Sequence, residues 1–379
     1  MASMLFSAPV GIFLVAFGDG FKILVYSSKF GHSHSTFMGR LADILVEEGH
    51  DVTTLMPILY PALADGTMKS KIIKVQPSNK TLQIYLEALA AFANSFETTN
   101  FDLGHIMIGA HFARLFASSC DTTVNTEGLV ERLRDEEFDL MIAESLDMCG
   151  IGLSHAIAPK AVIGGSTMVL YGALYDEFGV PQALSYNPSL YISRHDPHSI
   201  IDRAWNLFGD WLLRQWFGGV GRDEIDQVMA AHFGSEYPSV KSLASRVAYV
   251  FTNAEPLIDF AHSTLHRVLD LGGIGAKEPR PLDQKWDAVL SLRPRTVLLS
   301  FGSVALSTGI PPRTKSSILR ALSSFPDVTF IWKYEAIGDE FSAREAAHVE
   351  NVHLTEWMPQ NDLLSKSTRQ CYCRVTRIF

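Results

Sequence analysis

One stretch near the N-terminus, residues 22–55, constrains the fold most, because it has the pattern of a complete strand, loop, helix and strand. Residues 23–26 form a short apolar run, which is typical of a strand buried on both faces of a parallel sheet. A helix is predicted to follow, with Thr36 as its N-cap and Gly49 at a left-handed C-terminal cap. Residues 51–55 are predicted to form the second strand of an α/β fold.

The predicted loop between the first strand and the helix, residues 30–36, contains two histidines, His32 and His34. In doubly wound folds, ligands bind where the carboxyl ends of strands meet the starts of helices. An imidazole changes charge near neutral pH, which suits a general base as well as a structural role. The loop by itself leaves open which of the two histidines, if either, is catalytic.

Composition excludes several classes of protein. At 379 residues the chain is long enough for about two domains. Its net charge of −9, without a basic stripe, argues against nucleic acid as the main partner. The four cysteines are too few for a disulfide scaffold, and Cys371 and Cys373 have no second pair with which to form a zinc site.

The first twenty residues are predicted to be a signal peptide, because residues 5–17 are apolar and end in a small-x-small pattern before Gly18. The alternative is a disordered or strand-like leader, since Lys or Arg is missing before Lys22. No later stretch reaches the roughly 18 apolar residues of a membrane-spanning helix. Asn79 begins a glycosylation sequon, so we expect a lumenal or peripheral protein of the endoplasmic reticulum.

A second strand and helix unit places a carboxylate at a strand end. Residues 138–143 are predicted to be a strand that ends in Glu144, and residues 149–158 a short helix. Glu144 and His34 both lie near the carboxyl ends of predicted strands, so the fold could bring them together. A carboxylate beside an imidazole orients the ring and stabilises its protonated form.

The remaining part of the first half is predicted to be mostly helical. Residues 57–135 show helical spacing in 81–96 and 105–119, and residues 160–163 form a strand ending at a Gly-Gly-Ser turn. The aromatic helix predicted at 200–217 could line an acceptor pocket, rest on a membrane surface or pack in the core.

A linker rich in Gly and Pro, residues 271–282, precedes a third unit. Residues 296–301 are predicted to be a strand that leads into Gly302 and Ser303, followed by a helix at 314–323 and a strand at 328–332. A glycine and a hydroxyl near a helix start favour phosphate binding.

Four motifs occur in one order: residues 22–34, 48–53, 299–303 and 357–364. Together they resemble the UDP-glycosyltransferase family, and specifically its UDP-glucuronosyltransferase type. The resemblance implies a GT-B fold with two Rossmann-like domains. Residues 21–285 would bind the acceptor, and residues 286–379 would form an incomplete domain that binds the UDP-sugar.

The resemblance also implies roles for individual residues. His34, counted back from the turn at Gly49, matches the catalytic base. Glu144 stands where the family has an Asp that supports this base, and Asp147 is a fallback. The implied donor-binding residues are Ser303 near the phosphates, Trp357 against uracil, and Gln360.

The implied activity is transfer of a hexose or glucuronic acid, with inversion, from a UDP-sugar to small lipophilic hydroxyl acceptors, without a metal or other cofactor. After Leu364 the sequence departs from the family and residues 365–379 form a basic tail, which suggests a C-terminally truncated member. The alternative function is therefore a non-catalytic isoform that binds lipophilic ligands or pairs with full-length transferases. Contact with a membrane surface is a further expected interaction.

Overall fold

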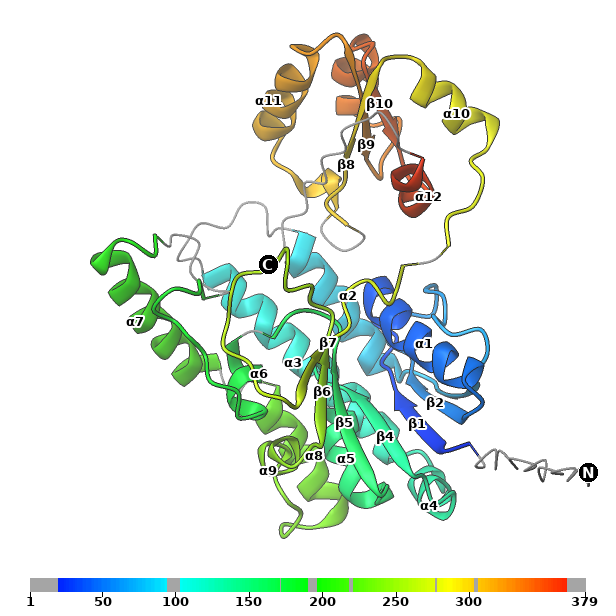
Figure 1. Cartoon of the computed structure of the whole chain (residues 1–379), viewed down its shortest axis with the longest axis vertical. Coiled ribbons are helices and arrows are strands. Elements are labelled where there is room, and N and C mark those ends of the chain that lie inside the picture. Colours follow the sequence, from blue (N-terminus) through cyan, green and yellow to red (C-terminus); the bar gives the residue numbers. More distant parts are fainter. Residues whose placement is uncertain are drawn as a thin grey trace, which may run out of the picture.

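The computed structural model describes residues 20–93, 103–170, 172–189, 196–217, 221–276, 278–302 and 306–366. Two parallel sheets organise these residues into two lobes joined by an extended linker (Figure 1). The larger sheet has seven strands in the order β3-β2-β1-β4-β5-β6-β7, and the smaller sheet has three in the order β10-β9-β8. This arrangement confirms the predicted α/β class.

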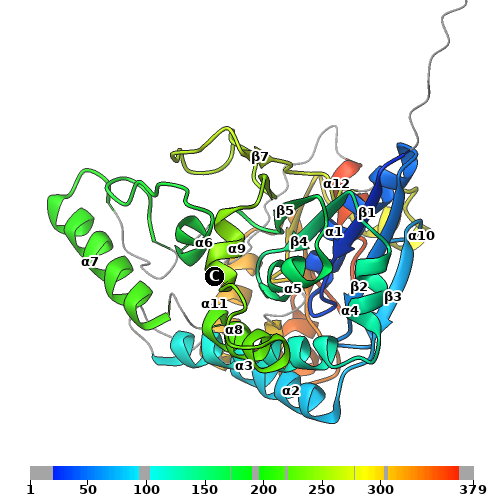
Figure 2. The ribbon, with the colours of Figure 1, turned by 90° about the horizontal axis from the view of Figure 1, so that it is seen from below.

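The larger sheet is covered by helices on both faces (Figures 1 and 2). One core lies between the sheet and α3, α4, α5, α8 and α9, and a second lies between the opposite face and α1. The strands are β1 (Lys22–Tyr26), β2 (Asp51–Pro57), β3 (Lys71–Val75), β4 (Leu140–Glu144), β5 (Ala161–Ser166), β6 (Tyr249–Thr252) and β7 (Val268–Asp270). The helices are α1 (His32–Glu47), α2 (Asn79–Ala93), α3 (Leu103–Val124), α4 (Leu129–Asp135), α5 (Cys149–Ile157), α6 (Gly172–Glu177), α7 (Ile200–Phe217), α8 (Arg222–Phe233) and α9 (Val240–Ser245).

Helix α1 begins earlier than predicted. Its N-cap is Gly31, in an extended conformation without a side-chain cap, and Thr36 lies inside the helix. The amide of Ser35 already donates to the Gly31 carbonyl, so His32 and His34 belong to the first helical turn. The predicted N-cap is therefore wrong, because the hydrogen bond from the Ser35 amide to the Gly31 carbonyl starts the helix without a capping hydroxyl. The C-terminal prediction is confirmed, since Gly49 has a φ of +91°.

Two strand assignments also differ from the predictions. Strand β3 falls in a stretch predicted to be helical, and it forms the edge of the sheet with Lys71 and Lys74 exposed. Strand β5 continues through Gly164 and Gly165, which were predicted to form a turn. A Cβ on Gly164 would lie 2.8 Å from the Phe178 ring, and a Cβ on Gly165 would lie 3.1 Å from the Met38 sulfur. These glycines therefore make room for neighbouring core side chains within the strand.

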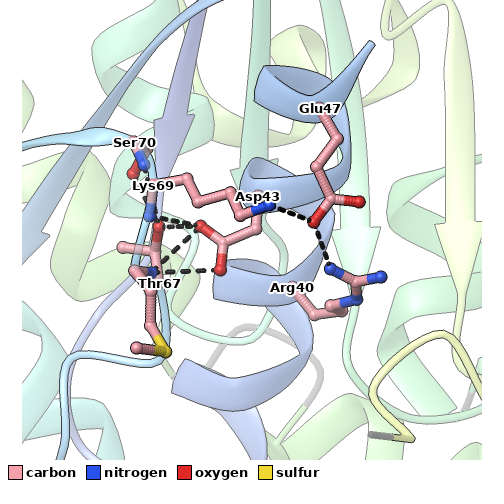
Figure 3. Close-up of polar contacts among 7 residues, drawn as sticks. Arg40, Asp43, Glu47, Thr67, Lys69 and Ser70 are labelled. Carbon is pink, nitrogen blue, oxygen red and sulfur yellow. Dashed lines mark hydrogen bonds and ion pairs between the residues drawn. The ribbon is translucent and has the colours of Figure 1, made fainter. Parts of the chain in front are cut away.

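Helix α1 is held against the loop that precedes β3 (Figure 3). Asp43 is buried and accepts hydrogen bonds from the Thr67 hydroxyl and from the backbone amides of Met68 and Lys69. Exposed ion pairs of Arg40 and Lys69 with Glu47 surround this contact. Charge-assisted bonds from several donors to one buried carboxylate fix the loop on the helix.

A disulfide between Cys120 and Cys149 joins the end of α3 to the start of α5. Both cysteines are fully buried. The bond ties the segment that follows β4 to the helical layer, which holds the residues between Glu144 and α5 in place. Cysteine count alone did not identify this pair.

The smaller lobe has its own apolar cores around Trp332 and around Trp286. Its elements are α10 (Gln284–Ser291), β8 (Arg295–Leu299), α11 (Pro312–Ser323), β9 (Val328–Lys333), β10 (Val352–Thr355) and α12 (Gln360–Ser365). The predicted domain boundary near residue 285 falls beside the start of α10 and stays a prediction. Residues 1–19 and 367–379 lie outside the described residues, so the predicted signal peptide and basic tail have no structural account.

Candidate active site

Two predicted residues meet at the carboxyl edge of the larger sheet. Strands β1 and β4 are parallel neighbours with Tyr26 opposite Ala143, so Glu144 lies one residue beyond the paired segment. His34 reaches the same edge from the first turn of α1, and its Nδ1 contacts Glu144 Oε1. The Glu144 side chain is fully buried, and that of His34 is 12% exposed. The catalytic roles of the two residues stay predictions.

Thr167, which follows β5, completes this contact. Its hydroxyl lies 2.6 Å from His34 Nδ1 and 3.4 Å from Glu144 Oε1. An ionised carboxylate accepts hydrogen bonds but cannot donate them, so it favours the tautomer with the hydrogen on Nδ1. The Nε2 lone pair is then available to accept a proton from a bound hydroxyl group. Sequence reasoning did not find Thr167, although it directly follows the Gly-Gly-Ser turn predicted after the fifth strand.

Asp147 lies behind this pair and is almost fully buried. It accepts hydrogen bonds from the Ser28 hydroxyl, the Tyr26 hydroxyl and the backbone amide of Cys149. Burial, followed by the negative charge of Glu144, raises the pKa of Asp147 to about 7. Burial and the Asp147 charge raise the pKa of Tyr26 as well.

An aromatic and aliphatic cluster packs on one side of His34. The Phe30 and His34 rings lie 4.3 Å apart between centroids, and the Phe30 and Phe116 rings 5.1 Å. Tyr85 donates a hydrogen bond from its hydroxyl to the Phe30 carbonyl oxygen at 3.2 Å. The buried members of the cluster are Phe30, Leu59, Tyr85, Ala88, Leu115 and Phe116. The His34 ring therefore contacts this apolar cluster through Phe30.

The other candidate histidine, His32, does not contact Glu144 but faces the smaller lobe. Its ring lies edge-on to Trp357, with 6.1 Å between centroids. Trp357 is 61% exposed, and Lys333 Nζ lies 5.9 Å from its ring centroid. The structure therefore brings Trp357 next to the first residue of the helix that carries His34.

Of the remaining predicted donor-binding residues, the structure describes Gln360 but not Ser303. Gln360 is the first residue of α12 and follows Trp357 closely in the chain. Ser303 lies outside the described residues, and its proposed contact with the phosphates stays a prediction. Among the residues that the structure describes, no three His, Cys, Asp or Glu side chains are grouped as metal ligands. The expected absence of a metal stays a prediction.

Comparisons with known proteins show the family and the fold. Residues 21–373 match the family described as "UDP-glucoronosyl and UDP-glucosyl transferase". The UDP-glucuronosyltransferase named ugt-47 of Caenorhabditis elegans is 24% identical over 365 residues, which cover 93% of this chain and 66% of that protein. This chain thus spans slightly less than two thirds of that relative's length.

Solved structures show the same fold. The glycotransferase of kitacinnamycin has a TM-score of 0.55 at 14% identity, covering 94% of this chain and 75% of the other. TcCGT1, solved in complex with UDP, has a TM-score of 0.50 at 11% identity, covering 94% and 77%. These similarities confirm the predicted GT-B fold. Since the family match extends over nearly the whole sequence, the chain belongs to the UDP-glucuronosyl and UDP-glucosyl transferase family.

Proposed function

We propose that this fold transfers a hexose or glucuronic acid from a UDP-sugar to the hydroxyl group of a small lipophilic acceptor, with inversion at the anomeric carbon. The contact between His34 and the buried Glu144 carries the proposal. A neutral alcohol or phenol is a weak nucleophile, and a positioned base of this kind typically accelerates such a reaction by about 10²–10⁴-fold.

In the proposed reaction, His34 Nε2 accepts the acceptor proton while the acceptor oxygen forms a bond to the anomeric carbon. The bond between that carbon and the β-phosphate oxygen breaks on the opposite side, and UDP leaves with the electron pair. Glu144 stabilises the imidazolium that forms, because its carboxylate pairs with Nδ1. The extra methylene of Glu relative to Asp is accommodated, since the contact is made.

The apolar cluster around Phe30 supports a lipophilic acceptor. Phe30 contacts the imidazole ring directly, and Phe116 and Tyr85 extend the apolar environment away from it. Ligand sites combine apolar walls with a few polar groups that orient the ligand. In this site the imidazole would orient the acceptor hydroxyl, and the cluster would bind the remainder of the acceptor.

The smaller lobe is the proposed donor site. Trp357 offers an exposed indole that can stack on a uracil ring, and Lys333 places a positive charge beside it. The UDP complex of the structurally similar TcCGT1 supports a uridine nucleotide as the ligand of this fold. Gln360 and Ser303 are proposed to contact the nucleotide on the basis of the family motif.

The test is to incubate the chain with radiolabelled UDP-glucose or UDP-glucuronic acid and a panel of phenols, and to separate the glycosides. Labelled product from either donor would support the proposal. Acceptor binding without any product would support the alternative, a chain that binds lipophilic ligands without turnover. A chain that binds neither UDP nor phenols would contradict both functions.

Helix α7 supports a further partner, a lipid bilayer surface. Two of its polar side chains, Asn206 and Asp210, are fully buried, and Asn206 donates to the backbone carbonyls of Leu184 and Asn187. Its apolar side chains from Ile200 to Trp211 are mostly exposed, which supports the membrane-surface alternative for this helix. The exposed ones are Ile200, Ile201, Trp205, Leu207, Phe208 and Trp211. The helix lies at the periphery of the larger lobe in both views (Figures 1 and 2).

This outward face has the composition of an interfacial helix, with Trp and Phe at the surface and few charges. Six of its residues, including Ile200, Ile201 and Phe208, line a hollow of about 610 Å³. Because the protein carries a net charge of −9, we propose contact with a zwitterionic bilayer rather than a strongly anionic one. No helix among the described residues has the length and hydropathy required to span a bilayer.

Replacing Phe208 and Trp211 by Asp is expected to release the chain from phosphatidylcholine vesicles. Each aromatic side chain that leaves the interface loses about 1.5–3 kcal/mol, so partitioning should fall about tenfold or more per substitution. Vesicle flotation measures the bound fraction. The matched control is Phe325→Asp, which changes an exposed aromatic in the smaller lobe. Equal binding of all variants would contradict the proposed surface.

The buried disulfide between Cys120 and Cys149 supports a secretory location. Disulfides of this kind persist in oxidising compartments such as the endoplasmic reticulum lumen. Together with the outward face of α7, this bond favours a lumenal protein at the membrane surface, and the predicted signal peptide agrees with that location.

A further inference from the structure

Two buried carboxyl groups, not one, lie behind the imidazole of His34. Glu144 is fully buried, and Asp147 is 3% exposed. Glu144 ends β4, and Asp147 follows it by three residues, directly before the start of α5. Burial, followed by the negative charge of Glu144, raises the pKa of Asp147, so ionisation of one carboxyl group disfavours ionisation of the other.

The charges around these groups do not balance if both carboxyls are ionised. Asp147 faces the Tyr26 hydroxyl of β1, the Ser28 hydroxyl, the Cys149 amide at the start of α5, and Glu144 of β4. None of these groups is a cation. In this described cluster, His34 is the one side chain that can carry a positive charge, and it contacts Glu144.

Burying a second negative charge without a counter-charge is costly. Glu144 Oε2 is itself buried and has no hydrogen-bond partner among the described residues. A neutral Asp147 leaves one negative charge opposite one imidazolium, which is the balanced arrangement during proton transfer. An ionised Asp147 adds a second buried negative charge to this cluster.

We propose that Asp147 is a positioning residue of the His34–Glu144 pair. Asp147 binds a proton, so the buried carboxyl groups of this cluster carry only the single negative charge of Glu144. Asp147 does not contact the substrate in this proposal and acts through Glu144. The proposal deepens the proposed transferase function and rests on it for its role in turnover. Its charge state can nevertheless be measured without turnover.

The experiment compares wild type with Asp147→Asn, a substitution that keeps the shape of the side chain and removes its ionisation. The His34 ring proton is assigned in the NMR spectrum by its loss in His34→Gln and is followed from pH 5 to pH 9. Interacting groups titrate together, so the wild-type His34 signal should also respond to the titration of Asp147. The Asp147→Asn signal should lack that response, whereas any effect of Glu144 is common to both proteins.

The matched control is Asp226→Asn. Burial also raises the pKa of Asp226. This residue lies on α8, and its carboxylate accepts a hydrogen bond from the Val240 amide rather than from the His34 cluster. The His34 curve of this control should match that of wild type. Identical His34 curves in wild type and Asp147→Asn would overturn the proposal whether or not the chain is active.

A second measurement, the pH dependence of stability, tests the same proton without an NMR spectrum. The folded-state pKa of Asp147 lies above the unfolded-state value, so the folded state binds the extra proton between about pH 4 and pH 7. The contribution of this proton to the free energy of unfolding of wild type is therefore lost as the pH rises from about 4 to about 7. The denaturation midpoint of wild type should fall relative to that of Asp147→Asn, and a constant difference would overturn the protonated state.

If the chain is active, the dependence of kcat/KM on pH separates this proposal from the function. Wild type should show an ionisation near pH 7 that Asp147→Asn lacks, whereas a structural defect alone would lower the whole profile evenly. Absence of turnover in both proteins would contradict the proposed activity and leave the His34 titration as the test of Asp147.

Discussion

Replacing His34 by Ala is expected to lower kcat for glycosyl transfer by about 10²–10⁴-fold, because the acceptor hydroxyl loses its proposed base. Acceptor and donor binding should change much less, since the imidazole contributes mainly in the transition state. Single-turnover assays with labelled UDP-sugar measure the rate, and fluorescence titration measures binding. The free Glu144 carboxylate cannot substitute, because it is fully buried behind the ring.

His50→Ala is the matched control for this prediction. His50 follows the C-terminal end of α1 and accepts a hydrogen bond from the Phe21 amide, away from Glu144. Its replacement should keep most of the wild-type kcat. His32→Ala then distinguishes the two histidines of the first turn: an effect on donor KM would fit its contact with Trp357. Full activity of His34→Ala would remove this residue as the base.

Replacing Gly39 by Ala is expected to destabilise the larger lobe by about 2–3 kcal/mol, although the same change usually stabilises a helix interior. A Cβ at position 39 would lie 2.2 Å from the Gly66 carbonyl carbon and 2.5 Å from the Thr67 amide nitrogen. Both obstacles are backbone atoms. They cannot move easily, because Asp43 holds the loop through the Thr67 hydroxyl and two amides (Figure 3).

Gly109→Ala is the matched control: it makes the same chemical change, but it is expected to stabilise the protein. Gly109 lies in α3, and a Cβ there would meet no described atom within 4 Å. The free energy of unfolding should therefore rise by about 0.5–1 kcal/mol, as for an unobstructed helix position. Urea denaturation monitored by circular dichroism measures both variants. A stabilised Gly39→Ala protein would show that the loop can retreat from α1.

Local sequence pattern predicted most of the elements that position the site. The apolar runs of β1 and β4 are short and continuous, as expected for strands buried on both faces. The pattern failed where a long-range contact decides the structure. Strand β3 has two exposed lysines and exists because it pairs with β2. The Gly-Gly pair of β5 remains in the strand because Phe178 and Met38 occupy the adjacent space.

The start of α1 shows the same limit at the candidate site. Thr36 had the side chain of a good N-cap, yet the helix begins at His32 through a backbone bond to Gly31. The shift places His34 in a rigid first turn, where its ring direction is set by the helix. A loop histidine would lack that constraint.

The sequence by itself determined the family and the α/β class and predicted His34 and Glu144 as site residues, because strand ends and ordered motifs are local features of the chain. Only the tertiary structure decided what surrounds this pair. Thr167, Asp147 and Tyr26 come from three separate segments, and they meet because parallel strands end at one edge of the sheet. Likewise, the outward apolar face of α7 depends on the loop that binds its polar side. Periodicity shows that a helix has two faces, but the packing partner decides which face is buried.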